Sequence, residues 1–277
     1  MALTTQERQR LQGIARELRL TVIDVMAWSG GAHVGGSLSS IDILTMLYFK
    51  YLNIDPSAPQ WEDRDRFVLS KGHAAAGLIP VLAKRGYFPE ETLKTFNHFG
   101  SPFAMHPDSN KVIGCDASAG SLGHGLSMAL GMALGARQLK KPWKTVCLMG
   151  DGECCEGSVW EAAMAASNFK AGNLVGIVDR NRFMIDGETE DVMKLEPFAD
   201  KWRCFGWEVV EIDGHDLDQI DDALAQAWAA TDTPVLILAN TVKGKGVDFM
   251  ENNVVYHYAS ADSELCAKAK ASILKEG

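Results

Sequence analysis

An aspartate and an asparagine that each follow an apolar run are the side chains of this sequence best suited to hold a cation. Asp151 lies between two glycines directly after the apolar run 145–149, and Asn181 comes soon after a second apolar run, 174–178. An amphipathic stretch separates the two runs, so the pattern predicts a strand–helix–strand unit. Because parallel strands end at the same edge of their sheet, where such folds bind ligands, we expect Asp151 and Asn181 to lie together.

Carboxylate and carboxamide oxygens at one sheet edge are suitable ligands for a hard cation. Mg²⁺ takes about six oxygens at about 2.1 Å and usually shares the phosphate oxygens of a substrate. Gly150 and Gly152 have no side chains, so a diphosphate can approach the backbone on either side of Asp151. Taken alone, Asp151 is equally well explained as a helix cap, but with Asn181 at this spacing the pattern predicts a cation–diphosphate site.

Five other segments extend this pattern over nearly the whole of the 277 residues, and together they resemble the N-terminal, diphosphate-binding half of the transketolase family. The segments are 30–36 (GGAHVGG), 69–73 (LSKGH), 105–107 (MHP), 120–125 (GSLGHG) and 212–216 (IDGHD). The resemblance implies an α/β fold of the thiamine diphosphate-binding type, with a mostly parallel sheet and helices on both faces. It implies one such domain over residues 1–277 and, as its activity, two-carbon ketol transfer between sugars.

The same resemblance assigns the metal ligands and the cofactor contacts. Asp151, Asn181 and the backbone carbonyl of Phe183 would be the protein ligands of Mg²⁺, for which Ca²⁺ or Mn²⁺ can substitute. The residue before Asn181 is Arg180, where the family often has aspartate or asparagine, and this departure leaves the ligand in place. For residues 120–122 the alternative is an ordinary tight turn before a helix. The residues that the resemblance assigns to thiamine diphosphate are His73, Gly120, Ser121, Leu122, Gly152, Asn181 and His257.

Five of the seven histidines, at positions 33, 73, 106, 124 and 257, lie in or at the ends of loops rich in glycine or proline. Histidine donates hydrogen bonds to phosphate and transfers protons near neutral pH, so several of them at one sheet edge indicate a catalytic site. The resemblance assigns His33 and His106 to the substrate and the donor ketose, His73 to the diphosphate, and His257 to the thiazolium and a substrate oxygen. After His257 stands Tyr258, where the family usually has glycine.

Other residues keep two interpretations. Glu156 resembles a glutamate that the family uses at its subunit contact and between its active sites, and a helix-capping acid is the alternative. Lys243 and Lys245 follow a strand end, and we favour solvated lysines over phosphate ligands. For the adjacent cysteines 154 and 155 we favour two small residues in a turn over redox chemistry. The histidines without a catalytic assignment are His98 and His215, expected to be structural, and His124, which stands where many family members have glutamine.

Strands and helices that alternate along the chain must position these residues. The apolar patterns predict strands at 66–69, 145–149, 173–178, 207–212 and 234–239. They predict helices at 5–28, 39–52, 74–85, 123–140, 156–170, 195–205, 216–230 and 262–275, with a further helix that opens at Pro89. We expect loops at 30–37, 98–120 and 246–262. Such alternation is typical of a parallel sheet that is covered on both faces.

The composition limits the possible partners. A formal net charge of −9 argues against nucleic acid and acidic membrane surfaces. No run reaches the roughly 18 apolar residues of a membrane span, and residues 1–20 have no apolar signal core. The six cysteines show no zinc-binding spacing, so we expect a protein of the reducing cytoplasm.

The family resemblance also implies a partner chain. Transketolases use a glutamate of a second domain to activate the aminopyrimidine ring, and we expect a separate chain, not a continuation after Gly277, to supply it. We therefore expect half of a split transketolase, inactive alone, that acts on sugar phosphates with a separate C-terminal, pyrimidine-domain subunit in an α2β2 heterotetramer. The alternatives are a subunit of a pyruvate-using thiamine diphosphate synthase or dehydrogenase, and a non-catalytic cofactor-binding protein.

Overall fold

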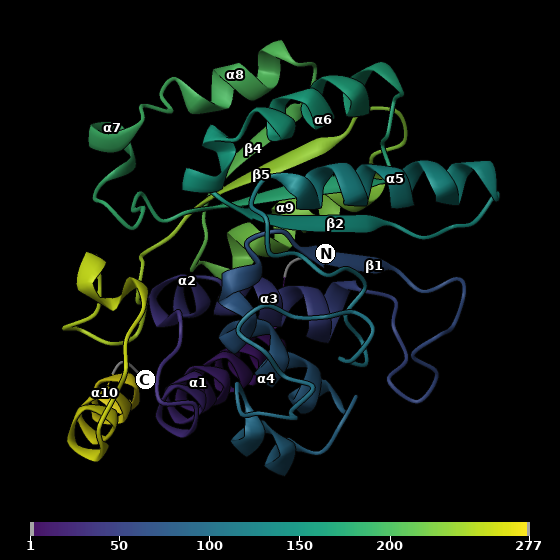
Figure 1. Ribbon diagram of the computed structural model, residues 1–277. Coiled ribbons are helices and arrows are strands. Elements are labelled where there is room, and N and C mark those ends of the chain that lie inside the picture. Colours follow the sequence, from purple (N-terminus) through teal and green to yellow (C-terminus); the bar gives the residue numbers. More distant parts are fainter. Residues whose placement is uncertain (1–2, 276–277) are drawn as a thin grey trace.

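A five-stranded parallel sheet forms the centre of the protein within residues 3–275, the part of the chain that the computed structural model describes (Figure 1). Its order is β1-β2-β3-β5-β4, and each neighbouring pair is parallel. This arrangement confirms the predicted α/β class with a mostly parallel sheet. The strands are β1 (Arg66–Leu69), β2 (Thr145–Gly150), β3 (Leu174–Arg180), β4 (Glu208–Asp213) and β5 (Val235–Asn240).

The central strands β2, β3 and β5 are continuous apolar runs because helices bury both of their faces. Gly150 at the end of β2 pairs with Asp179 near the end of β3. This register brings Asp151 and Asn181 to the same edge of the sheet. The strand–helix–strand unit that the apolar pattern predicted is therefore present, and it carries both residues at the expected place.

Helices cover both faces of the sheet and divide the interior into two apolar cores (Figure 1). Successive strand residues point to opposite faces. One face is covered by α5 (His124–Gln138), α6 (Gly157–Asn168) and α8 (Phe198–Cys204), and the other by α1 (Thr5–Trp28), α3 (Ile41–Met46), α4 (Ala75–Arg85) and α9 (Leu217–Ala229). Cys147 and Met149 of β2 pack with the helices of the first face, whereas Val146 and Leu148 pack with those of the second.

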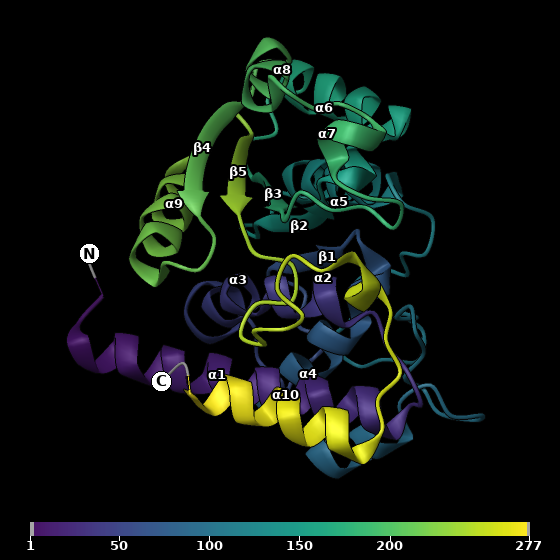
Figure 2. The ribbon, with the colours of Figure 1, turned by 90° about the vertical axis from the view of Figure 1, so that its left-hand side faces the viewer.

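Two long helices from opposite ends of the chain lie side by side (Figure 2). α1 begins after Thr4, whose side chain and that of Glu7 form a reciprocal capping box. α10 (Ser263–Lys275) packs along α1, and an ion pair joins Lys270 to Asp24. Both helices agree with their predicted bounds within one residue.

The predicted glycine-rich loop 30–37 is wrong for residues 34–37, which are helical. α2 (Val34–Ser39) begins directly after His33, and the predicted helix 39–52 divides into α3 and a π-helical turn, η1 (Leu47–Tyr51). The hydroxyls of Ser39 and Ser40 donate to the carbonyl of Gly36. Such local bonds compete with the regular hydrogen-bond ladder of a helix, which accounts for the break between α2 and α3 at Ser40.

Short helical turns occupy the segments between the main elements. η3 replaces the α-helix expected after Pro89, η5 lies within the expected loop 246–262, and α8 begins only after Pro197. No helix of the described residues is long and apolar enough to span a membrane. The turns are η2 (Gly72–Ala74), η3 (Glu90–Thr95), η4 (Gly152–Cys155), α7 (Thr189–Val192) and η5 (Val254–His257).

Candidate active site

A pocket of about 380 Å³ opens at the edge of the sheet where β2 and β3 end. The fold brings all but one of the predicted site residues to its walls. Ser121 is the exception, because it is exposed to solvent and does not line the pocket. The predicted residues that line it are His33, His73, His106, Gly120, Leu122, Asp151, Gly152, Glu156, Asn181, Phe183 and His257.

Asp151 is held at the end of β2 by backbone donors. Its Oδ1 accepts the N–H of Gly152 at 2.8 Å, and its Oδ2 accepts the N–H of Arg182 at 2.6 Å. The side chain is almost fully buried. Burial and the nearby carboxylate of Asp179 raise the pKa of Asp151 to about 6, against the opposing effect of its hydrogen bonds and of Arg180. A carboxylate in this environment gains free energy from an added cation.

The other two predicted metal ligands lie at the end of β3. The Oδ1 of Asn181 accepts the N–H of Phe183 at 3.2 Å, and its Nδ2 donates to Asp179 at 3.0 Å. Asp151, Asn181 and the carbonyl of Phe183 are thus hard oxygen donors on one pocket wall. The described residues contain no group of three His, Cys, Asp or Glu side chains that could hold a metal. The donor set fits Mg²⁺ if phosphate oxygens complete the coordination.

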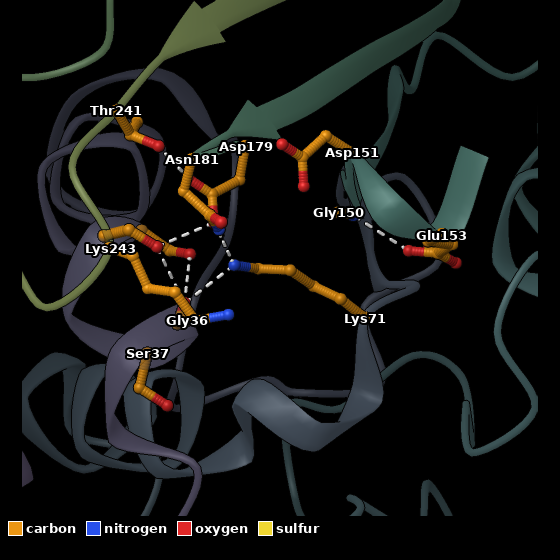
Figure 3. Close-up of polar contacts among 12 residues, drawn as sticks. Gly36, Ser37, Lys71, Gly150, Asp151, Glu153, Asp179, Asn181, Thr241 and Lys243 are labelled. Carbon is orange, nitrogen blue, oxygen red and sulfur yellow. Dashed lines mark hydrogen bonds and ion pairs between the residues drawn. The ribbon is translucent and has the colours of Figure 1, made fainter. Parts of the chain in front are cut away.

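A buried ion pair lies beside these ligands (Figure 3). The ammonium of Lys71 contacts the carboxylate of Asp179, and it also donates to the carbonyl of Gly36 at 2.7 Å. Ser39 donates to Asp179 at 2.7 Å, and Thr241 donates to it as well. Burial alone would raise the pKa of Asp179, but Lys71 and the hydroxyl donors hold it below its usual value. The pair therefore joins α2, the end of β1 and β3, and Gly36 and Lys71 themselves line the pocket.

Glu153 joins three segments of the site, and the sequence did not predict this role. Its Oε1 accepts the N–H of Gly123 at 2.9 Å and the hydroxyl of Ser70, and its Oε2 accepts the N–H of Gly150 at 2.9 Å. These partners belong to the segments that carry His73, Leu122 and Asp151. One buried carboxylate thus sets the mutual positions of the predicted diphosphate and aminopyrimidine contacts. The one sequence feature that could have indicated this role is the position of Glu153, two residues after Asp151.

Lys243 lies inside the pocket, so the expectation of a solvated lysine is wrong for this residue. Its side chain is only 1% exposed, and its Nζ lies 3.0 Å from the carbonyl of Phe183 and 2.9 Å from Nδ1 of His257. Burial lowers the pKa of Lys243 to about 8. Lys243 follows β5, whose end lies on the same sheet edge as those of β2 and β3, and this adjacency brings it inward. Lys245 is partly exposed and contacts Glu251 at 3.4 Å.

Four histidines from distant segments converge on the pocket. The ring centre of His33 lies 5.3 Å from that of His73, 5.5 Å from that of His257 and 6.3 Å from that of His106. Burial, with neighbouring charged and histidine groups, lowers the pKa of His33 to about 4 and that of His257 to about 3. These rings are therefore neutral near pH 7. Each one can donate a single hydrogen bond and accept another.

Glu156 and His124 are both exposed to solvent, and only Glu156 lines the pocket. Glu156 is exposed at the start of α6, and although it occupies the capping position its side chain makes no capping hydrogen bond. His124 is exposed at the start of α5 and does not line the pocket. Of the adjacent cysteines, Cys154 is buried in η4 and Cys155 lines the pocket. Neither is in a disulfide.

His215 lies outside the pocket but supports one of its walls. Its Nδ1 lies 2.8 Å from the carboxylate of Asp42, and its Nε2 accepts the N–H of Val242 at 2.8 Å. These contacts require a proton on Nδ1, so the neutral ring has one defined tautomer. Val242 directly precedes Lys243, and His215 therefore holds the turn from which the buried lysine enters the pocket.

Comparisons with known proteins place this fold and site in a family context. Residues 11–273 match the family model described as transketolase, thiamine diphosphate binding domain. The chain is 42% identical over 273 residues to the 6-deoxy-6-sulfo-D-fructose transketolase subunit SqwG of Clostridium sp., with 99% of each chain covered. It is 42% identical over 258 residues to an apulose-4-phosphate transketolase subunit of Phocaeicola vulgatus, with 93% of this chain and 91% of the relative covered.

Solved structures show the same architecture. The transketolase from Campylobacter jejuni matches with a TM-score of 0.90 and 33% sequence identity. The match covers 96% of this chain but only 43% of that chain. The transketolase from Leishmania mexicana matches with a TM-score of 0.89, over 95% of this chain and 41% of that chain. The chain thus spans less than half the length of either solved transketolase.

Proposed function

Since this chain belongs to the transketolase family through its thiamine diphosphate-binding domain, we propose that it transfers a two-carbon ketol group from a ketose to an aldose. The observation that carries this proposal is one pocket in which hard oxygen donors, a glycine-flanked carboxylate, a buried lysine and four histidines converge. The matched relatives are named as transketolases, which supports ketol transfer over the pyruvate-using alternative.

The oxygen donors and Lys243 would hold the diphosphate end of the cofactor. Asp151, Asn181 and the carbonyl of Phe183 would bind Mg²⁺, and the N–H of Gly152 would donate to a phosphate oxygen. Lys243 contacts a carbonyl and a neutral histidine, and among the described residues it makes no ion pair with a carboxylate. A buried cation without a counter-ion is costly, so an anionic ligand beside it is favoured.

The histidines would bind and orient the substrate. Thiamine diphosphate, when bound, supplies the carbanion chemistry of the reaction. The neutral ring of His33 would exchange hydrogen bonds with sugar hydroxyls, and His106, whose ring centre lies 6.3 Å from that of His33, would contact the same sugar. His257 would polarise a substrate oxygen, and Lys243, 2.9 Å from its Nδ1, orients its ring. His73 would donate to the diphosphate.

We propose that the active unit is an α2β2 heterotetramer with a separate pyrimidine-domain subunit. Two relatives that match this chain along almost their whole length are named as transketolase subunits. The surface formed by α5 and α6 includes the exposed apolar residues Leu139, Met164 and Phe169, and Glu156 at the start of α6 also lines the pocket. This surface, here called the α5–α6 surface, would contact a second copy of the chain. All six cysteines are free, which suits the reducing cytoplasm.

The substrate class that we propose is a ketose with a phosphate or sulfonate group. The names of the two relatives specify a sulfonated fructose and apulose 4-phosphate. The partner subunit would supply much of the surface that contacts the far end of such a sugar, because this chain spans less than half of each solved transketolase.

The test combines cofactor binding with ketol transfer. Thiamine diphosphate binding is measured by calorimetry in Mg²⁺, and transfer from a ketose phosphate to an aldose phosphate is followed with the chain alone and with its partner. We expect activity from the complex only, and an Asp151→Asn affinity at least about tenfold weaker because a charged ligand is lost. Asp191→Asn, an exposed acid on α7, is the matched control and should leave binding unchanged.

Each alternative has its own outcome. Strong ketol transfer by the highly purified lone chain would contradict the need for a partner. Release of carbon dioxide from pyruvate, without ketol transfer, would support the synthase or dehydrogenase alternative. Cofactor binding without any turnover in the complex would indicate a non-catalytic cofactor-binding protein.

A further inference from the structure

Tyr258 is placed beside His33 by a short backbone bridge between the two ends of the chain. Ala32 and Ala259 pair in antiparallel fashion, and their N–H groups donate to each other's carbonyls at 2.9 and 3.0 Å. Each of these alanines is the neighbour of one of the two aromatic residues. The ring centre of Tyr258 consequently lies 5.0 Å from that of His33, in an edge-to-face arrangement at 75°.

Gly31 makes room for the phenol. Its φ of +153° is a conformation that residues with a side chain rarely adopt, and a Cβ there would lie 2.6 Å from the phenol oxygen. Any side chain at this position would therefore displace Tyr258 from His33. Gly31, the Ala32–Ala259 bridge and the contact with His33 together fix the position of Tyr258.

His33 and Tyr258 each have a polar atom that makes no hydrogen bond within residues 3–275. Nδ1 of His33 is buried without a hydrogen bond, and within residues 3–275 no hydrogen bond is made by the phenol of Tyr258. Tyr258 is 47% exposed, whereas His33 lines the pocket. Within the described residues, His33 is the only pocket histidine whose ring Tyr258 contacts, and the contact is edge-to-face. Tyr258 thus contacts His33 from outside the set of residues that line the pocket, and its hydroxyl has no hydrogen-bond partner in the part of the chain that the structure describes.

We infer that Tyr258 is a specificity-determining residue for the donor sugar. Its ring narrows the approach to His33, and its hydroxyl exchanges a hydrogen bond with a hydroxyl group of the ketose beyond the two carbons that are transferred. A phenol is neutral at pH 7 and both donates and accepts, which suits a sugar hydroxyl. The position outside His33, away from Asp151 and Asn181, assigns it to the distal part of the donor. This inference rests on the proposed function.

The experiment compares donors that differ in their distal hydroxyls, in the complex of this chain with its partner subunit. Hydroxypyruvate carries the two-carbon unit without hydroxyl-bearing carbons beyond it, whereas fructose 6-phosphate and 6-deoxy-6-sulfofructose carry them. For Tyr258→Phe we expect KM to rise about tenfold for the long donors, as for the loss of one hydrogen bond, with kcat little changed. KM for hydroxypyruvate and the affinity for thiamine diphosphate should change less than about twofold.

Two further variants separate the hydroxyl from the ring and from general effects. Tyr258→Gly removes the ring as well, and we expect KM for both long donors to rise at least as much as in Tyr258→Phe, with KM for hydroxypyruvate again changed less than about twofold. Tyr256→Phe is the matched control, because Tyr256 packs against Phe249 and makes no ring contact with His33. This variant should leave KM unchanged for hydroxypyruvate and for the two long donors.

The outcomes distinguish failure of this inference from failure of the proposed function. Equal effects of Tyr258→Phe on short and long donors, or no effect on either, overturn the role of Tyr258. Transfer from hydroxypyruvate with neither long donor accepted by the unchanged chain also overturns it and leaves ketol transfer standing. No transfer from any donor refutes the proposed function, and this inference with it.

Discussion

Lys71 and Lys243 are both buried at the same sheet edge, yet they differ in what surrounds them. Lys71 has a counter-ion in Asp179, which is itself fully buried and bonded by two hydroxyls. Lys243 faces a backbone carbonyl and a histidine. The two charges of a buried ion pair compensate each other, whereas a buried ammonium without a carboxylate is stabilised when an anion binds beside it. We therefore propose a structural role for Lys71 and a ligand-binding role for Lys243.

Replacing Lys243 by methionine tests this division, because methionine keeps an unbranched side chain and removes the charge. We expect the affinity for thiamine diphosphate to fall about tenfold or more, as for loss of a charged hydrogen bond, while the affinity for thiamine changes little. Calorimetry in Mg²⁺ measures both ligands. Lys194→Met, at an exposed lysine, is the control. Equal losses for both ligands would show that Lys243 supports the fold and not the diphosphate.

The depressed pKa of His33 predicts how stability depends on pH. Above pH 6.5 the ring is neutral in both the folded and the unfolded chain, whereas between pH 6.5 and about 4 only the unfolded chain binds the proton. The free energy of unfolding should therefore decrease as the pH falls through this window. Urea denaturation at pH 7 and pH 5 should show a smaller decrease for His33→Asn than for the unchanged chain. His124→Asn, at an exposed histidine, should keep the full decrease.

At the scale of elements, close backbone contacts decide where the site loops lie. Gly72 at the start of η2 packs against the segment that leads to Gly120, so that an added Cβ would lie only 1.6 Å from the carbonyl oxygen of Ala119. Glu153 then bonds to Ser70 and Gly123, which flank the same contact. The segment that carries His73 and the segment that carries Leu122 are thus positioned as one unit.

Gly72→Ala should break this unit. We expect the free energy of unfolding to fall by about 3 kcal/mol because a backbone atom must move to relieve the overlap, and cofactor affinity should fall with it. Urea denaturation and calorimetry measure the two effects. Gly131→Ala on α5 is the opposite case, because a Cβ there meets nothing, and it should stabilise the lone chain by about 0.5–1 kcal/mol. Tolerance of alanine at position 72 would show that the two segments do not need this contact.

The elements themselves were largely predictable from the sequence. Strands β1 to β5 and helices α4, α5, α6 and α9 match their predicted bounds within two residues, because burial on one or both faces leaves a clear apolar pattern. The start of α2 was missed. Its residues are mainly glycine and serine, and they become helical through packing: α2 is fully buried, and Gly36 accepts hydrogen bonds from Lys71 and two serines.

For the whole molecule, the α5–α6 surface is the one that we propose as the contact with a second copy of the chain. On the α5–α6 surface, Met164 is 59% exposed, close to the 60% exposure of Leu274 on α10. Met164 lies on α6, whose N-cap residue Glu156 lines the pocket, whereas Leu274 lies on α10. If two copies of the chain assemble through this surface, the pocket of each copy would lie beside the contact between them.

Met164→Lys should therefore weaken assembly of the complex, because a charge in an apolar contact loses its hydration without a partner. Light scattering coupled to size exclusion should show smaller species for this variant when the partner chain is present. Leu274→Lys makes the same change at equal exposure and should assemble normally. Normal assembly of Met164→Lys would place the contact between copies elsewhere.

The sequence by itself determined that Asp151 and Asn181 lie at one sheet edge, since they follow two apolar runs whose local pattern specifies parallel strands. Only the tertiary structure decided which other groups join that edge. Lys243 becomes buried, Glu153 joins three segments, and Tyr258 meets His33 across the Ala32–Ala259 bridge. The physical reason is that burial and hydrogen-bond partners depend on segments that are far apart along the chain, whereas periodicity records only what each segment does locally.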